Sequence, residues 1–464
     1  MKVRRRFARI FVLIVVFLLC YGIYYCWVSF PVVTGYSAKI LCSAIFVSGR
    51  TEGDVKSQEL DYTPLNLANS IVNYEDSSVT SSMFGFANRT AIYRKGLGAT
   101  MVNDLSEQQI RSQQFAQALM PNVQPDSIPW PMGDKLQNSI PSEVDSSRLE
   151  AAVQNLFKET DTTNPNRTRA LVVVYDNNII VEKYAPGFSK NIRLTGWSMT
   201  KSITSAIAGV LVEQNRLNID APAPVPEWKE NDDPRHQITT RHLLQQTTGL
   251  KFEEVYSKSS HATRMLCEHG DMGAYAASLR LQHAIGSRFH YSSGNSNILS
   301  RIIRHIVGDN DYHAFPYEQL FYRIGMYSIV LEPDASGTFV GSSFCFATAR
   351  DWARFGLLYL NNGMFNGQQI LSPDWVKQSV TPSSVAEQGE YGFQWWLNKG
   401  KAGRREKRLF PTLPEDLFFA DGFEGQNVFV IPSKKLVVVR LGFTRKKEYG
   451  EVRFLEDVIA AVKS

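Results

Sequence analysis

Residues 171–184 have the sequence LVVVYDNNIIVEKY, in which two runs of β-forming residues flank a turn-forming Asp-Asn-Asn. This pattern predicts a β-hairpin. Residues 428–441, VFVIPSKKLVVVRL, show the same arrangement around Pro-Ser-Lys-Lys and predict a second hairpin. The sequence between the two hairpins is rich in helical patterns. We therefore expect an α+β fold whose antiparallel sheet is completed by strands from both ends of this segment.

The rest of the chain differs in composition from this segment. The domain pattern covers residues 146–464 and ends in a predicted amphipathic helix, with apolar residues at helical spacing from Phe454 to Val462. Residues 31–145 contain strand-like stretches and then five prolines between positions 121 and 141, which indicate an extended connection. We predict a partly β N-terminal extension over 31–145, preceded by a basic stub and transmembrane anchor over 1–30.

The charge of the chain is concentrated at its N-terminus. The 464 residues have a formal net charge of +5, but residues 1–51 contain seven basic residues and no acidic one, so the remaining 413 residues sum to −2. The folded body is therefore almost neutral, which argues against nucleic acid as a partner. A content of 44% hydrophobic and 20% charged residues excludes a disordered or fibrous chain.

The segment Ile10–Phe30 is almost wholly apolar, and a helix of about 20 residues spans a bilayer core. Five basic residues precede it, which predicts a cytoplasmic N-terminus and an exported body, periplasmic in a Gram-negative cell. A cleaved signal peptide is the alternative. Its apolar region is usually about 7–15 residues long and ends in a small-x-small site. Here the run is longer and ends in Tyr24-Tyr25-Cys26-Trp27, which favours an uncleaved single-pass anchor with its aromatic rings at the far interface.

Five cysteines are present, and two of them lie inside the apolar run. The other three, Cys42, Cys267 and Cys345, allow at most one disulfide. Buried free thiols are the simpler expectation.

Residues 196–201, Gly-Trp-Ser-Met-Thr-Lys, place Ser198 and Lys201 at the start of a predicted amphipathic helix. Residues three apart share a helix face. A serine hydroxyl needs a base to become a nucleophile, and a partly desolvated lysine with a lowered pKa can accept its proton. A helix N-terminus also stabilises negative charge on an acyl oxygen. The alternative is a capping serine with a surface lysine, because Ser-x-x-Lys alone recurs by chance.

Further segments give this pair a context. Residues 289–295 form a polar, turn-rich loop before another helical pattern, and residues 420–426 contain glycines that would let a substrate approach the backbone. In this order, the segments resemble the serine β-lactamase/penicillin-recognising superfamily, in particular its class C-like esterase and 6-aminohexanoate-dimer hydrolase branch. Ser198-Met-Thr-Lys201 is similar to the family's Ser-x-x-Lys. Tyr291-Ser-Ser293 occupies the Tyr-x-Asn position.

The resemblance covers roughly residues 145–464, and other segments also look like family landmarks: 243–250, 348–356, 391–396 and 420–422. It implies an antiparallel β-sheet flanked by helices plus an all-helical subdomain. It also implies that Ser198 attacks a carbonyl to form an acyl-enzyme, with Lys201 and Tyr291 as the general base and acid in an order left open. The oxyanion hole would be the backbone N–H groups of Ser198 and Phe423.

Two departures from the family pattern bear on the substrate. Ser293 replaces the usual asparagine, and Ala420 replaces the lysine of Lys-Thr-Gly, a cation suited to a substrate carboxylate. Both argue against an efficient β-lactamase or D,D-peptidase and favour an esterase or amidase. The residues then expected to bind substrate are Ser293, Asp421, Gly422, Glu253 (or its neighbour Glu254) and Trp395 (or its neighbour Trp396).

The remaining signals point away from other classes. His261, Cys267, Glu268 and His269 lack the spacing of a metal site, and Gly-x-Ser-x-Gly and phosphate-loop motifs are absent, so we expect neither metal nor cofactor. The prediction is a membrane-anchored serine hydrolase acting on small-molecule esters or amides. The alternatives are a weak or inactive binding protein of the same fold, or a cell-wall peptide hydrolase. The sequence leaves the substrate, protein partners and oligomeric state open.

Overall fold

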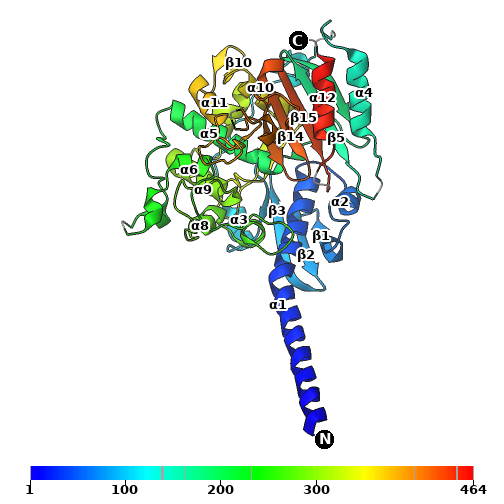
Figure 1. Ribbon diagram of the computed structural model, residues 1–464, viewed down its shortest axis with the longest axis vertical. Coiled ribbons are helices and arrows are strands. Elements are labelled where there is room, and N and C mark those ends of the chain that lie inside the picture. The colour runs from blue at the N-terminus through cyan, green and yellow to red at the C-terminus, as the bar shows by residue number, and fades with distance from the viewer. Residues whose placement is uncertain are drawn as a thin grey trace.

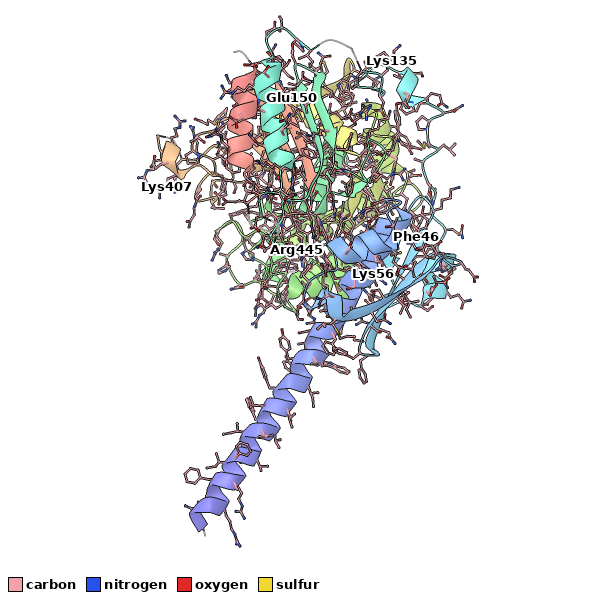
Figure 2. All side chains as sticks on the ribbon, turned by 90° about the vertical axis from the view of Figure 1, so that its right-hand side faces the viewer. Phe46, Lys56, Lys135, Glu150, Lys407 and Arg445 are labelled. Atoms are coloured by element: carbon pink, nitrogen blue, oxygen red, sulfur yellow. The ribbon has the colours of Figure 1, made fainter. Side chains whose placement is uncertain are left out.

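The computed structural model describes residues 2–136, 140–161, 163–230, 232–401, 403–445 and 448–462. A single long helix, α1 (Lys2–Phe46), projects from a rounded body as a stalk (Figure 1). Its inner end continues into the body (Figure 2). The two parts are described in turn, beginning with the sheet that the sequence predicts.

The main sheet has six antiparallel strands in the order β12-β13-β14-β15-β5-β6. Both predicted hairpins are confirmed: β5 (Thr168–Tyr175) pairs with β6 (Asn178–Tyr184), and β14 (Gln426–Ile431) pairs with β15 (Leu436–Gly442). The sheet joins the C-terminal hairpin directly to the first one through β15 and β5. At one end of the sheet, β13 (Phe418–Gly422) pairs with the short edge strand β12 (Trp396–Leu397). The expected α+β fold is confirmed.

Successive side chains along the strands belong to two different cores, one on each face of the sheet. In β5, Val172 and Val174 join the large core with α5 (Thr200–Glu213) and α10 (Ala349–Leu360). Leu171 and Val173 face the opposite side, where α4 (Ser146–Phe157) and α12 (Glu451–Ala461) cover the sheet. Successive side chains of a strand point to opposite faces, so a strand that is buried on both faces is apolar throughout. The predicted C-terminal helix is α12.

Short helices form a subdomain beside the sheet: α6 (Thr240–Leu244), α7 (His261–Glu268), α8 (Met272–Ala277) and α9 (Ser293–Val307). A small sheet of β7 (Leu194–Thr195), β9 (Cys345–Ala347) and β8 (Val330–Leu331) lies between the two parts. The remaining regular elements are α2 (Glu52–Gln58), α3 (Glu107–Ser112), β10 (Met364–Phe365), β11 (Gln368–Gln369) and α11 (Pro373–Ser379).

The N-terminal extension contains a four-stranded antiparallel sheet of β1 (Ala68–Asn73), β2 (Ser78–Met83), β3 (Phe86–Arg94) and β4 (Gly98–Met101). This sheet packs around the inner half of α1, and its core continues into residues of the helical subdomain. Helix α1 runs without a break past Pro31, so it crosses the predicted boundary between anchor and extension. Its turns from Val33 to Ala44 are buried.

A buried ion pair joins α1 to the main body of the molecule. Lys39 pairs with Glu332, and their side chains are 4% and 0% exposed. The Glu332 carboxylate also accepts hydrogen bonds from the Ser43 hydroxyl (3.0 Å) and from the backbone N–H of Ala99 in β4 (2.6 Å). One carboxylate therefore links α1, the small N-terminal sheet and the segment after β8.

The two basic residues that follow the apolar run thus form buried ion pairs within the fold. Arg50, like Lys39, is buried, and it shares the carboxylate of Glu59 with Arg169 of β5. Charged side chains that leave water need a partner, and here each acquires one.

The outer part of α1 is exposed and apolar. Its most apolar 18-residue window has a mean hydropathy of 2.4 and none of it is buried. By length and composition this helix is suited either to crossing a membrane or to serving as a signal sequence.

The Lys39–Glu332 pair gives a stability prediction. Lys39→Met leaves a buried carboxylate without its cation, and we expect a loss of about 3–5 kcal/mol in the free energy of unfolding. Lys39→Met combined with Glu332→Gln removes both charges and should recover most of that loss. Chemical denaturation of the detergent-solubilised protein measures both, and a single-variant loss below about 1 kcal/mol would contradict the buried pair.

Candidate active site

Ser198 lies in a short 3-10 turn, η3 (Trp197–Met199), that leads directly into α5. Trp197 has a left-handed backbone (φ 46°), which is strained for a bulky side chain. Its ring stacks on Tyr36 of α1 at a centroid distance of 6.0 Å and an interplanar angle of 7°. Phe344 and Phe423 pack against the same ring. This packing holds the turn that presents Ser198.

Lys201 is buried one turn further along the chain and points back to Ser198. Its Nζ donates hydrogen bonds to Ser198 Oγ (2.9 Å), to Ser293 Oγ (3.0 Å) and to the backbone carbonyl of Ser342 (3.0 Å). Burial lowers the pKa of Lys201 from 10.5 to about 8, although the carboxylates of Glu254 and Asp421 oppose the shift. A lysine with this pKa can accept a proton near neutral pH.

Helix α5 explains why Lys201 is buried. The sequence predicts an amphipathic helix, but every residue from Thr200 to Leu211 is buried, including the polar ones. Two of its hydroxyls donate to internal carbonyls: Ser202 Oγ to that of Gln394 at 2.7 Å, and Thr204 Oγ1 to that of Gly341 at 2.8 Å. The helix runs through the centre of the domain, which sequence periodicity alone could not show.

Tyr291 completes the predicted trio. Burial raises its pKa well above the usual value, and a hydrogen bond with Ser198 opposes that shift. Its ring lies 5.0 Å from Lys201 Nζ and stacks on Trp396 at 5.4 Å. Ser198, Lys201 and Tyr291, which are up to 93 positions apart in the sequence, therefore meet at one point. Tyr291 is a neutral phenol at physiological pH.

Two further residues join this group. Glu254 accepts hydrogen bonds from the Ser293 backbone N–H (2.8 Å) and hydroxyl (2.6 Å), and from the Tyr256 hydroxyl (2.7 Å). Ser293 in turn contacts Lys201. From the sequence, Glu254 is expected at the site only as an alternative to its neighbour Glu253, and Tyr256 is not expected there. The loop that carries both residues has no motif and no periodicity that would indicate them.

A buried amide network holds the Tyr291 loop in place. Gln246 Oε1 accepts hydrogen bonds from Asn295 Nδ2 (2.7 Å) and from the Ser292 N–H (3.2 Å). Gln394 Oε1 accepts one from Ser296 Oγ at 2.8 Å. Both glutamines belong to segments that look like family landmarks. Their role here is to fix the start of α9, which follows Tyr291, against α5.

The expected oxyanion residues lie on segments in contact. The end of β13 packs against η3 so closely that a Cβ added at Gly422 would lie 2.2 Å from the Gly196 carbonyl oxygen. Only glycine fits there. Phe423 follows directly, and its ring packs against Trp197 at a centroid distance of 5.7 Å. Glycine at position 422 is thus a backbone requirement, whereas the Phe423 side chain is exposed, 41% accessible.

Two predicted substrate-binding side chains, Glu253 and Trp395, lie elsewhere. Glu253 is exposed and pairs with Lys258 (2.6 Å), because successive residues of an extended loop point in opposite directions and Glu254 takes the inward position. Trp395 is fully buried in the core against Phe355, whereas its neighbour Trp396 contacts Tyr291.

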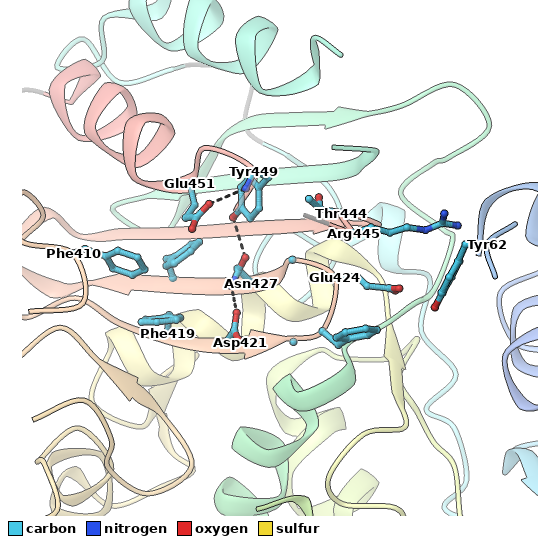
Figure 3. A pocket seen from close by; sticks show the side chains of 14 residues that line it. Tyr62, Phe410, Phe419, Asp421, Glu424, Asn427, Thr444, Arg445, Tyr449 and Glu451 are labelled. Atoms are coloured by element: carbon cyan, nitrogen blue, oxygen red, sulfur yellow. Dashed lines mark hydrogen bonds between the residues drawn. The ribbon is translucent and has the colours of Figure 1, made fainter. Parts of the chain in front are cut away.

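Asp421 projects from the opposite face of β13 to Ala420, which lies in the large core. Its carboxylate accepts a hydrogen bond from Asn427 (2.8 Å), which is itself bonded to Tyr449 (2.9 Å), at the wall of a cavity of about 550 Å³ (Figure 3). Burial raises the pKa of Asp421 to about 7. Its influence on the site is electrostatic, through Lys201, rather than by contact.

The five cysteines are all free thiols, and Cys42, Cys267 and Cys345 are buried. Among the residues that the structure describes, no group of three or more His, Cys, Asp and Glu side chains is arranged to hold a metal ion.

Comparison with known proteins agrees with this geometry. A family model described as Beta-lactamase matches residues 153–462. The 6-aminohexanoate-dimer hydrolase of Paenarthrobacter ureafaciens is 24% identical over 328 residues, covering 63% of this chain and 77% of that protein. Similar structures include a penicillin-binding protein homologue from Caulobacter crescentus (TM-score 0.54, 14% identity) and a family VIII carboxylesterase (TM-score 0.54, 15% identity). Each covers 71% of this chain and is itself fully covered. The family model spans more than half of the sequence and includes Ser198, Lys201 and Tyr291, so the chain belongs to the Beta-lactamase family.

Proposed function

We propose that this protein is a membrane-anchored serine hydrolase that cleaves ester or amide bonds through an acyl-enzyme on Ser198. The observation that carries the proposal is the 2.9 Å hydrogen bond between Ser198 Oγ and the Nζ of a buried Lys201 whose pKa is lowered to about 8. Nucleophilic serines are activated by an adjacent base of this kind.

The pKa shifts suggest how the two proton-transfer groups divide the work. Neutral Lys201 accepts the Ser198 proton as Oγ attacks the carbonyl carbon. Tyr291 keeps its proton at neutral pH and contacts Ser198, so it is placed to protonate the leaving group. The backbone N–H groups of Ser198 and Phe423 stabilise the oxyanion. Water then attacks the acyl carbon and releases the acid.

The site chemistry favours a neutral substrate group over a carboxylate. Ala420 offers no cation, and Glu254 and Asp421 place negative charge near Lys201. Named relatives include an amide hydrolase for 6-aminohexanoate dimers and a carboxylesterase. Ser293 keeps a hydrogen bond to Lys201 where the family pattern has asparagine, which favours an active enzyme over an inactive binding protein.

The structure of α1 supports an uncleaved anchor. The apolar outer part and the buried inner part form one continuous helix, and the inner part belongs to the core. The apolar run also lacks the small-x-small end of a signal peptide. We infer that the helix stays attached and that the catalytic domain lies on the side opposite the basic N-terminus.

The first prediction concerns the nucleophile. The full-length protein in detergent should react with a fluorophosphonate probe at Ser198 and hydrolyse p-nitrophenyl butyrate. Ser198→Ala should abolish both, because it removes the hydroxyl that lies 2.9 Å from Lys201 Nζ. Labelling found by peptide mass spectrometry at another serine, or none on folded protein, would contradict the proposal.

The second prediction concerns the base. Lys201→Ala should lower kcat for p-nitrophenyl butyrate by about 10²–10⁴-fold, the usual contribution of a positioned base. Thermal unfolding of the variant, monitored by circular dichroism, controls for loss of the fold. A loss of only twofold in a folded variant would make Lys201 a structural residue.

The third prediction is a pH profile. Only neutral Lys201 is a base, so kcat/KM should rise with pH and level off above about pH 8. The Glu254 carboxylate stabilises the lysine ammonium, so Glu254→Gln should move the rising limb to lower pH. Glu253→Gln is a matched control, because this side chain pairs with Lys258 at the surface and should leave the profile in place. Equal shifts in the two variants, or none in Glu254→Gln, would exclude the proposed coupling.

A further inference from the structure

An apolar cavity of about 290 Å³ lies between α1 and the catalytic part of the body. Its walls come from three places: the inner half of α1, the loop that follows α2, and the segments around α7. The apolar side chains that line it include Tyr25, Val33, Ile40, Leu65, Leu266 and Phe344. No part of the proposed chemistry uses this space.

The inner end of the cavity adjoins the active site. Three of its lining residues, Trp197, Tyr256 and Phe423, are part of the machinery described above. Trp197 precedes the nucleophile, and the Tyr256 hydroxyl lies 3.3 Å from Ser293 Oγ. The Phe423 ring packs between the other two, at centroid distances of 5.7 Å and 5.6 Å. An apolar chain in the cavity would therefore end beside the oxyanion residue.

The outer end of the cavity reaches the part of α1 that leaves the body. Tyr25 and Ser29 line it there, next to the exposed apolar turns of the helix. In Figure 1 the strands β1 and β2 extend along α1 at this level. The turn that follows β2 carries Phe84, and β3 begins with Phe86; they are 68% and 72% exposed, and Phe84 packs edge-on against Phe30 of α1 (6.1 Å). Large exposed apolar groups beside a membrane helix are typical of a surface that rests on lipid.

The cavity is a built feature with fixed walls. Gly35 brings α1 so close to α7 that an added Cβ would lie 2.8 Å from the Cβ of Cys267. The Lys39–Glu332 pair and the stacking of Tyr36 on Trp197 fix the helix on the other sides. Pockets that bind small molecules are concave, mostly apolar and largely preformed, as this one is.

We propose that the substrate is an amphiphile with a long acyl chain, taken from the membrane that holds α1. This assignment rests on the proposed serine hydrolase function. The acyl chain lies in the cavity and its carbonyl carbon reaches Ser198. Oγ forms a bond to that carbon and Lys201 takes the hydroxyl proton; the bond to the alcohol or amine then breaks as that group takes a proton from Tyr291, which Lys201 reprotonates. In the second half, a water molecule gives a proton to Lys201 and its oxygen bonds to the acyl carbon; the bond to Ser198 breaks as Oγ regains a proton, and the fatty acid is released.

The test uses the full-length protein reconstituted in phosphatidylcholine vesicles, with p-nitrophenyl butyrate and p-nitrophenyl laurate as probes. Each buried methylene favours binding by roughly fourfold. We expect kcat/KM for laurate to exceed that for butyrate by at least tenfold. The initial laurate rate should also be higher when the ester is in the same vesicles as the enzyme than when it is supplied in separate vesicles.

Variants separate the cavity from simple partitioning of laurate into lipid. Val33→Trp fills the cavity from α1, and Leu266→Trp fills it from α7; each should lower the laurate-to-butyrate ratio at least tenfold. Val16→Trp makes the same change as Val33→Trp on the exposed outer part of α1 and should leave the ratio unchanged. Because the readout is a ratio measured on active enzyme, an unfolded variant cannot imitate the result.

The outcomes distinguish the two proposals. Turnover of butyrate with no preference for laurate, or a preference that both cavity variants retain, would overturn the acyl-chain assignment and leave the hydrolase function standing. Equal laurate rates from the same and from separate vesicles would overturn the membrane as the source. If the folded protein hydrolyses neither ester, the proposed function fails, and this assignment fails with it.

Discussion

The pairing of Lys39 with Glu332 is the constraint on which the arrangement of the molecule depends. Both charges are buried, and the carboxylate also accepts a hydrogen bond from the small N-terminal sheet. Removing either partner would leave an uncompensated charge in the core, so helix, small sheet and catalytic domain are held as one body. The direction of the stalk relative to the active site is therefore fixed by the fold. An anchor joined by a flexible linker would give no such geometry.

The same contact surface reaches the nucleophile. Tyr36 lies one turn before Lys39 and stacks on Trp197, whose left-handed backbone presents Ser198. Strained residues persist only where their surroundings over-determine them, and here part of that support comes from the helix. On the other side of the site, the burial of α5 on all faces lowers the pKa of Lys201, the proposed base. The N-terminal helix thus helps to hold the turn that carries Ser198.

The elements that the sequence predicts well are those whose signals are local. The two hairpins, α12 and the Ser198–Lys201 spacing each lie within a few residues, and ordered motifs add Tyr291. The errors arise where distance or direction matters. Lys39 and its partner are 293 positions apart, so the sequence shows an unpaired cation. Glu253 and Glu254, like Trp395 and Trp396, differ only in which way a side chain points, and a loop or a two-residue strand has too little periodicity to show it. Pro31 suggests a boundary that the helix passes.

The absence of the family's lysine at position 420 is consistent with a substrate that is recognised through the apolar cavity. A lysine at position 420 would provide a cation for a substrate carboxylate, and its absence removes charge from the recognition of that end of the substrate. The rings of Trp197, Tyr256 and Phe423 pack together and offer apolar surface at the cavity instead. Recognition by burial of methylenes is proportional to chain length and needs no charged partner. A site that lacks this cation and adjoins an apolar cavity walled by α1 is suited to the proposed substrate, whose distinguishing feature is its acyl chain.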